Sequence, residues 1–167
     1  RLVCGNLRLH QELQERIADF KQTQRSLVFT SGYAANLGAI TALVGHGDAV
    51  FADKLNHASL VDAVILSRAE FKRYPHKDVQ ALEALLKESK TIKKLIVTDT
   101  VFSMDGDIAP LREIAQIAEK YNCLAIVDEA QATGTFGERC TVIVEELNVE
   151  NFFPLRIGTF SKALAVE

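Results

Sequence analysis

Short apolar runs alternate along the chain with longer segments in which apolar residues recur at helical spacing. Leu9, Leu13 and Ile17, for example, are separated by charged and amide side chains, which is the pattern of an amphipathic helix. The expected strands are 26–30, 49–53, 71–75, 94–99, 123–127 and 154–158, and the expected helices are 7–21, 34–44, 60–67, 79–87 and 111–121. Strands that alternate with helices predict a parallel sheet with helical crossovers, and therefore an α/β fold.

The stretch from 123 to 162 carries the most informative chemistry. Residues 123–127 are continuously apolar, as in a strand covered on both faces, and Asp128 follows at the point where this run ends. The expected strand 154–158 is followed closely by Lys162. Because ligands bind at the carboxyl ends of the strands in open parallel sheets, we expect Asp128 and Lys162 to face one cleft.

Two other turns that precede predicted helices could contribute to the same edge of the sheet. At Ser31, Gly32 and Tyr33, free N–H groups and the positive end of a helix dipole could hold a phosphate. His57 could serve in a cleft, or it could accept a hydrogen bond at the start of its helix. From the local sequence alone, an ordinary structural role is favoured for both Ser31 and His57.

Composition and charge argue against several classes of protein. The 167 residues are 48% hydrophobic, and a net charge of −3 with interspersed signs leaves no basic surface for nucleic acid. No apolar stretch reaches the roughly 18 residues that a membrane-spanning helix needs. Cys4, Cys123 and Cys140 are widely spaced, which favours a reducing, cytoplasmic location over a disulfide framework or a thiolate metal site. The turn at Asp105 lacks the spacing of an EF-hand, so we expect no metal.

Two kinds of chemistry could use the triplet 128–130, which reads Asp-Glu-Ala. A nucleotide hydrolase would also need a phosphate loop of the form G-x-x-x-x-G-K-[ST], and the chain contains none. The alternative is pyridoxal phosphate chemistry, in which a lysine amine bonds to the cofactor aldehyde and an acid pairs with the ring nitrogen. The chain offers these parts in order: Gly32 and Tyr33 for the phosphate, His57 for the ring face, Asp128 for the nitrogen, Thr159 for the phosphate and Lys162 for the aldehyde.

These strings together resemble the α-oxoamine synthase family, whose members are fold-type-I, aspartate-aminotransferase-like enzymes. The resemblance implies a three-layer α/β/α fold with a mainly parallel sheet. It also implies that residues 1–167 are part of a pyridoxal-phosphate-binding large domain, a fragment that lacks the N-terminal segment and the small C-terminal domain. The matching strings are 5–6, 9–13, 31–36, 56–59, 101–107, 128–130 and 158–164.

Within this family the motifs are most similar to the branch that serves biotin biosynthesis. That branch implies a C-acyltransferase that condenses L-alanine with pimeloyl-CoA, or pimeloyl carrier protein, to give 8-amino-7-oxononanoate. Glycine C-acetyltransferase and 5-aminolevulinate synthase activities are the alternatives, and a homodimer is implied for all of them. The implied roles are cofactor attachment and proton transfer by Lys162, ring stacking by His57, pairing with the ring nitrogen by Asp128, ring positioning by Ser103, and phosphate binding by Gly32, Tyr33 and Thr159.

Position 131 departs from the family pattern. The family has a histidine after the Asp-Glu-Ala triplet, and this chain has Gln131. Glutamine can donate a hydrogen bond, but it cannot carry a proton near neutral pH. Loss of a positioned acid–base group costs about 10²–10⁴-fold in rate, so a non-catalytic remnant is the second hypothesis.

Overall fold

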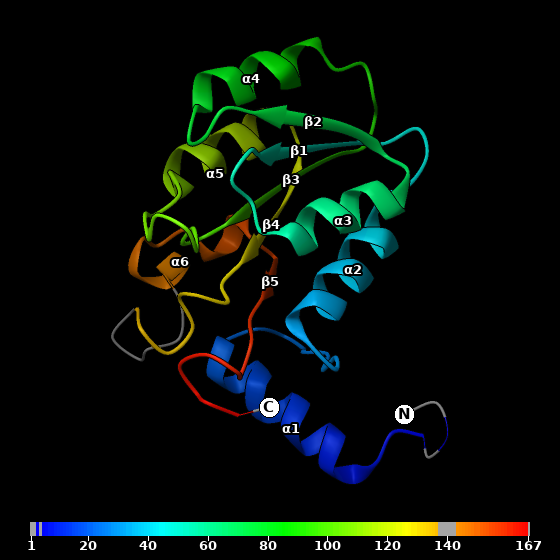
Figure 1. The fold of residues 1–167 in the computed structure, drawn as a ribbon, viewed down its shortest axis with the longest axis vertical. Helices are drawn as coiled ribbons and strands as arrows, with labels where there is room; N and C mark the ends of the chain where they lie inside the picture. The colour runs from blue at the N-terminus through cyan, green and yellow to red at the C-terminus, as the bar shows by residue number, and fades with distance from the viewer. Residues whose placement is uncertain (1–2, 4, 137–142, 167) are drawn as a thin grey trace. The chain divides into compact units, whose positions relative to one another are not determined.

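The computed structural model describes residues 3, 5–136 and 143–166 (Figure 1). The chain divides into two compact units, Arg1–Thr30 and Ser31–Glu167. Cys4 and Cys140 lie outside the described residues, and Cys123 is a free thiol.

The first unit contains the helix α1, Arg8–Lys21, as the spacing of its apolar residues predicts. The helix begins after Leu7, whose N–H donates to His10 Nδ1, and it ends at Gln22 in the left-handed conformation. The prediction of a strand at 26–30 is wrong, because this segment has no regular secondary structure. Its apolar residues are not enough to make a strand without a neighbouring strand to accept its backbone hydrogen bonds.

The second unit is built on a five-stranded sheet in which every neighbouring pair is parallel. The order across the sheet is β2-β1-β3-β4-β5. The strands are β1 (Ala49–Asp53), β2 (Glu70–Tyr74), β3 (Lys94–Asp99), β4 (Leu124–Asp128) and β5 (Leu155–Ile157). The prediction of a parallel sheet is confirmed.

Helices cover both faces of this sheet, so the three-layer prediction is also confirmed (Figure 1). One face packs against α2 (Gly32–Leu43) and α3 (Ala58–Ser67), and the other packs against α4 (Val79–Glu88) and α5 (Leu111–Lys120). Alternate residues of a strand enter the two cores: Val50 faces α2 and α3, whereas Phe51 faces α4 and α5. Since both faces are buried, the strands appear in the sequence as continuous apolar runs.

The connection between β4 and β5 contains two short helices, α6 (Ile143–Glu146) and η1 (Glu150–Phe152). No helix in the described part of the chain is both long and apolar enough to cross a membrane. The strand order reverses at β1, because the chain adds β2 on one side of it and β3 on the other. Such a reversal opens a crevice beyond the carboxyl ends of the two strands, and this is where α/β proteins bind ligands.

Candidate functional site

Three aspartates stand at the carboxyl ends of three neighbouring strands. Asp53 ends β1, Asp99 ends β3 and Asp128 ends β4, and each side chain is buried. Asp99 and Asp128 are paired in register, so their backbones lie side by side. Buried carboxylates need hydrogen-bond donors or cations close by, and the partners of these three define the site.

Asp128 receives one hydrogen bond on each carboxylate oxygen. The backbone N–H of Ala130 donates to Oδ1 (2.8 Å), and the side-chain amide of Asn36 donates to Oδ2 (2.7 Å). Asn36 lies on α2 and is 1% exposed. The sequence analysis did not single it out, although it follows Gly32 by four residues and therefore lies on the same face of the helix.

His57 is held from its backbone and from its ring. Its N–H donates to Asp99 Oδ2 (2.8 Å), and its Nδ1 accepts from the N–H of Ser59 (3.2 Å), so it is the N-cap of α3. The ring Nδ1 also lies 2.7 Å from Ser59 Oγ. The structural interpretation of His57 is thus confirmed, and the capping bond leaves the opposite ring nitrogen, Nε2, without a partner in the described part of the chain.

Asp99 is a second member of the site that the sequence analysis did not identify. Burial, and then the neighbouring carboxylate of Asp128, raise the pKa of Asp99 from 3.8 to about 7. The positive charge of Lys162 acts in the opposite direction on the same carboxyl group. The ammonium group of Lys162 is therefore close enough to the end of β3 to lower the pKa of Asp99.

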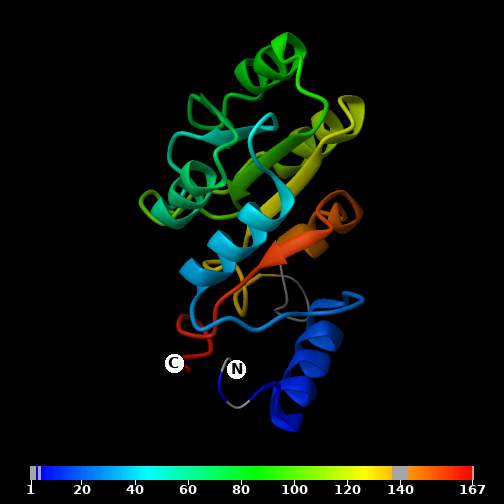
Figure 2. The same cartoon turned by 90° about the vertical axis from the view of Figure 1, so that its right-hand side faces the viewer.

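The N-terminus of α2 lies against the segment that follows β5 (Figure 2). A Cβ atom on Gly32 would collide with Cγ2 of Thr159, so the two residues are in close contact. Ser31 Oγ caps the helix by accepting from the N–H of Ala34 (3.1 Å), which confirms the capping interpretation. The hydroxyl of Tyr33 donates to Asp62 (2.7 Å), which raises the pKa of Tyr33 and directs the phenol toward α3.

This helix end has the donors that a phosphate requires. Thr159 Oγ1 is buried and has no hydrogen-bond partner among the described residues. The N–H groups of Gly32 and Tyr33, in the first turn of α2, point away from their own helix. A phosphate would satisfy all three donors and would also lie at the positive end of the helix dipole.

Two further candidates, Ser103 and Lys162, and also Gln131, where the sequence departs from the family pattern, make no side-chain hydrogen bond among the described residues. Ser103 is exposed in the turn that follows Phe102, and Lys162 is exposed beyond β5. Gln131 is half-buried just after β4, and only its backbone carbonyl accepts a bond, from the hydroxyl of Thr135 (3.2 Å). The structure does not bring Ser103 or Gln131 into hydrogen-bond contact with the other candidates.

A group of charged residues holds the turn that carries Ser103. His76 places Nδ1 3.0 Å from Asp53 and Nε2 3.0 Å from Asp107, and the ammonium group of Lys77 lies 2.9 Å from Asp107. We call these four residues the His76 clip. It joins the ends of β1 and β2 to the turn between Val101 and Ile108, which is closed by an antiparallel bridge.

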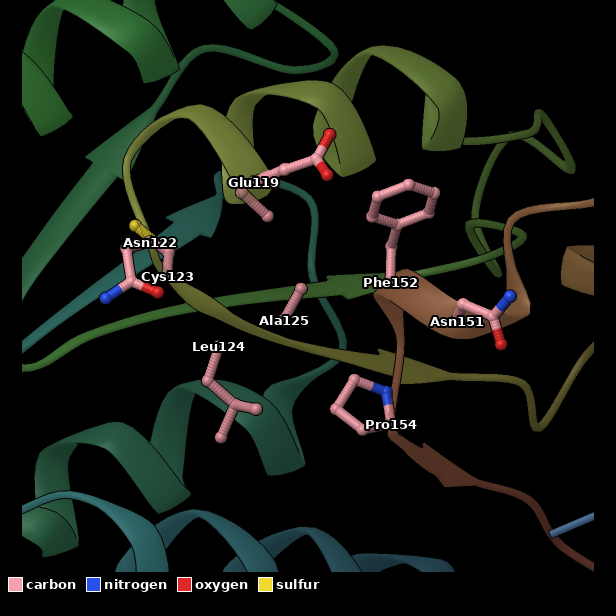
Figure 3. A pocket seen from close by; sticks show the side chains of 9 residues that line it. Glu119, Asn122, Cys123, Leu124, Ala125, Asn151, Phe152 and Pro154 are labelled. Carbon is pink, nitrogen blue, oxygen red and sulfur yellow. The ribbon is translucent and has the colours of Figure 1, made fainter.

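A hollow of about 500 Å³ lies at the opposite end of the sheet (Figure 3). It is bordered by the end of α5, the start of β4 and the segment that joins η1 to β5. Burial raises the pKa of the Cys123 thiol on its wall, so this cysteine is a poor nucleophile. The lining residues are Ala118, Glu119, Asn122, Cys123, Leu124, Ala125, Asn151, Phe152 and Pro154, which contain no cation to bind a phosphate.

Comparison with known proteins identifies the family. The pattern described as "Aminotransferase class I and II" matches residues 1–167. The chain belongs to this family. Its enzymes depend on pyridoxal phosphate, and the donors beside Gly32 and the buried acid Asp128 fit that cofactor.

Relatives within the class I and II aminotransferase family differ in their substrates. The chain is 52% identical over 165 residues to an 8-amino-7-oxononanoate synthase from Citrifermentans bemidjiense, covering 98% of this chain and 42% of that protein. A structure of serine palmitoyltransferase from S. paucimobilis with bound PLP and myriocin matches with a TM-score of 0.94 and 36% identity, covering 99% of this chain and 42% of that one. A structure of 8-amino-7-oxononanoate synthase from Francisella tularensis matches with a TM-score of 0.80 and 27% identity, covering 96% of this chain and 46% of that one. The chain thus spans less than half the length of the proteins it resembles.

Proposed function

We propose that the protein is a pyridoxal-phosphate-dependent C-acyltransferase that condenses an amino acid with an acyl thioester. The observation that carries the proposal is the buried hydroxyl of Thr159, which lies beside Gly32 at the start of α2 and has no hydrogen-bond partner in the described ranges of the chain. A hydroxyl in that position is costly unless a ligand accepts its hydrogen bond, and a phosphate is the ligand that a helix N-terminus favours. The N–H groups of Gly32 and Tyr33 would bind the same phosphate, with the Tyr33 phenol directed toward Asp62.

Asp128 and His57 would hold the ring of the cofactor. Asp128 is buried, and its oxygens keep lone pairs free beyond the bonds from Ala130 and Asn36, so it can accept a hydrogen bond from a protonated ring nitrogen. His57 would pack on the ring face, and Ser103 would lie near the phenolic oxygen. When bound, pyridoxal phosphate supplies an aldehyde for an amine and an electron-accepting ring.

Lys162 would carry out the proton transfer of the reaction. Its amine would hold the cofactor through the aldehyde and would later take the proton from the α-carbon of the amino acid. In the net reaction that α-carbon bonds to the acyl carbon, and the thiol leaves after it takes up a proton. The amino-acid carboxylate departs as carbon dioxide, and the proton held by Lys162 would return to the α-carbon. Gln131 cannot take part in proton transfer, so Lys162 would act without the histidine that the family has at position 131.

The substrates that we propose are L-alanine and pimeloyl-CoA or pimeloyl carrier protein, giving 8-amino-7-oxononanoate. The support is the 52% identity to a protein named 8-amino-7-oxononanoate synthase. The structural similarity to serine palmitoyltransferase makes L-serine and palmitoyl-CoA the competing pair of substrates. A homodimer remains a prediction from the family resemblance, and a cytoplasmic location remains a prediction from the widely spaced cysteines.

Absorbance spectroscopy tests the cofactor part of the proposal. Addition of pyridoxal phosphate to the protein should produce a visible band, and Lys162→Ala should remove it. Lys90→Ala is the matched control, because Lys90 is an exposed lysine away from the strand ends. A band that survives in Lys162→Ala, or one that is absent from the wild type, would contradict the proposal.

Turnover assays test the reaction. Release of thiol from pimeloyl-CoA with L-alanine should exceed release from palmitoyl-CoA with L-serine and from acetyl-CoA or succinyl-CoA with glycine. Gln131→His should raise the rate by about 10²-fold or more, because histidine restores a side chain that can carry a proton. A protein that binds the cofactor but turns over no pair of substrates, even as Gln131→His, would be the non-catalytic remnant.

A further inference from the structure

A continuous chain of hydrogen bonds joins the two side chains that are proposed to touch the cofactor ring. From Asp128 Oδ2 it runs 2.7 Å to Asn36 Nδ2, then 2.8 Å to Ser59 Oγ and 2.7 Å to His57 Nδ1. The two middle residues, Asn36 and Ser59, are each 1% exposed. The chain crosses three elements, because Asn36 is on α2, Ser59 is on α3 and Asp128 ends β4.

The donor and acceptor at each bond follow from the chemistry of the groups. The Asn36 amide nitrogen carries two hydrogens, and it gives one to Asp128 and one to Ser59 Oγ. The reverse orientation of the amide would set its oxygen against a carboxylate, so it is excluded. The amide oxygen has no partner among the described residues, so Asn36 acts only as a donor here.

The proton on the His57 ring follows from these assignments. Ser59 Oγ already accepts from Asn36, so its own hydrogen is available for His57 Nδ1. The N–H of Ser59 also donates to Nδ1, at 3.2 Å. A nitrogen that accepts from two donors carries no hydrogen, so the ring hydrogen of His57 is on Nε2.

We propose that Asn36 and Ser59 are positioning residues that fix His57 as the Nε2–H tautomer and hold Asp128 as an acceptor for the cofactor ring. This deepens the proposed function and rests on it for the role of the ring. Neither residue would touch the substrate. Because one amide serves both partners, a change at Asn36 should disturb His57 and Asp128 together, whereas a change at Ser59 should act mainly on His57.

Nitrogen NMR of the histidine rings tests the tautomer without any cofactor. The chain has only four histidines, so the His57 signals can be assigned by their loss in His57→Gln. In the wild type, Nδ1 of His57 should have the shift of an acceptor nitrogen and Nε2 that of a protonated one. Ser59→Ala should move the Nδ1 signal toward the average of the two tautomers, because only the longer bond from the backbone remains.

Ser67→Ala is the matched control for this measurement. Ser67 is a buried serine on the same helix, and its hydroxyl donates to the carbonyl of Val64 rather than to His57. Its replacement should leave the His57 signals unchanged. A hydrogen on Nδ1 in the wild type, or His57 signals that do not move in Ser59→Ala, would overturn the proposal.

A titration with pyridoxal phosphate tests the effect on Asp128. Asn36→Leu should weaken cofactor binding about tenfold or more, the size expected when a carboxylate loses a charge-assisted hydrogen bond. If Asn36→Leu does not fold, because leucine is larger than the asparagine that it replaces at this buried position, Asn36→Ala, which adds no volume and makes no hydrogen bond, serves in the same titration. An affinity of the Asn36 variant for pyridoxal phosphate equal to that of the wild type would contradict the proposal that Asn36 holds Asp128 for the cofactor ring. Failure of the wild type to bind the cofactor would instead contradict the proposed function and leave the tautomer result standing.

Discussion

Replacing Asp99 with asparagine should stabilise the folded protein at neutral and alkaline pH. Burial, and then Asp128, raise the pKa of Asp99 from 3.8 to about 7 in the folded state. As the pH rises above about 4, the unfolded chain therefore loses this proton before the folded protein does. The folded state is penalised progressively up to about pH 7, and the penalty is constant above that value. The asparagine variant removes the penalty, and its amide oxygen can still accept the bond from the N–H of His57.

The size of the effect follows from the two pKa values. A difference of about three pKa units corresponds to about 4 kcal/mol, at about 1.4 kcal/mol per unit, and this is an upper figure because solvent relaxation reduces it. Urea unfolding at about pH 8 should show the higher free energy of unfolding in Asp99→Asn, and unfolding at about pH 4 should show little difference from the wild type.

Asp105→Asn is the matched control, because Asp105 is an exposed carboxylate in the next turn. It should unfold like the wild type at both pH values. A stabilisation by Asp99→Asn that is equally large at about pH 4 would refute the electrostatic explanation, and so would the absence of any stabilisation at about pH 8. A carbon NMR titration of the Asp99 carboxyl group would measure its pKa directly.

Three further predictions concern the His76 clip and the N-terminus of α2, where we propose that the phosphate binds. Burial alone would lower the pKa of His76, but its hydrogen bonds to the two carboxylates of the His76 clip outweigh burial and raise it. The stability that the protonated ring provides is thus lost as the pH rises through that raised pKa. His76→Gln should lower the free energy of urea unfolding by about 1–3 kcal/mol near pH 6 and by less above pH 8. His46→Gln, at an exposed histidine, is the control and should leave the free energy of unfolding unchanged at both pH values. Gly32→Ala should lower the free energy of unfolding by about 1–3 kcal/mol, because the new Cβ atom would collide with Thr159. Gly45→Ala is the control and should not lower it, because its Cβ atom would meet its nearest neighbour at 3.9 Å. Equal effects of the two substitutions would contradict the close contact between Gly32 and Thr159. Thr159→Val should leave stability unchanged or slightly higher but weaken pyridoxal phosphate binding about tenfold in a fluorescence titration, so unchanged affinity would exclude its hydroxyl from the phosphate site.

The sheet could be predicted from the sequence because burial on both faces leaves a simple pattern. The run 123–127 is apolar at every position, and it forms β4 one residue later, Leu124–Asp128. The run 26–30 is apolar at its three central positions and forms no strand. The composition of a segment indicates only that it can adopt an extended conformation. A strand also requires a neighbouring strand to pair with, and no local sequence pattern shows where that neighbour lies.

The site could be predicted only where its residues carry a local signal. Asp128 stands out because a carboxylate follows a buried strand, and its position at the end of β4 is as expected. Asn36 gives no such signal, because its partner Asp128 is 92 residues away and the contact exists only once α2 packs near β4. The capping bond of His57 occupies Nδ1, and Nε2 has no partner among the described residues, so the functional interpretation of His57 remains a prediction.

The shortest strand of the sheet determines whether the proposed site is assembled. β5 has three residues and pairs with β4 alone, and the segment beyond it carries both Thr159 and Lys162. Detachment of β5 would remove the proposed phosphate donor and the proposed cofactor-binding amine in one event, while Asp128 would stay in place at the end of β4. Amide exchange at Ile157 should consequently slow when cofactor is added, and the amplitude of that change would report how often the empty protein opens at this edge.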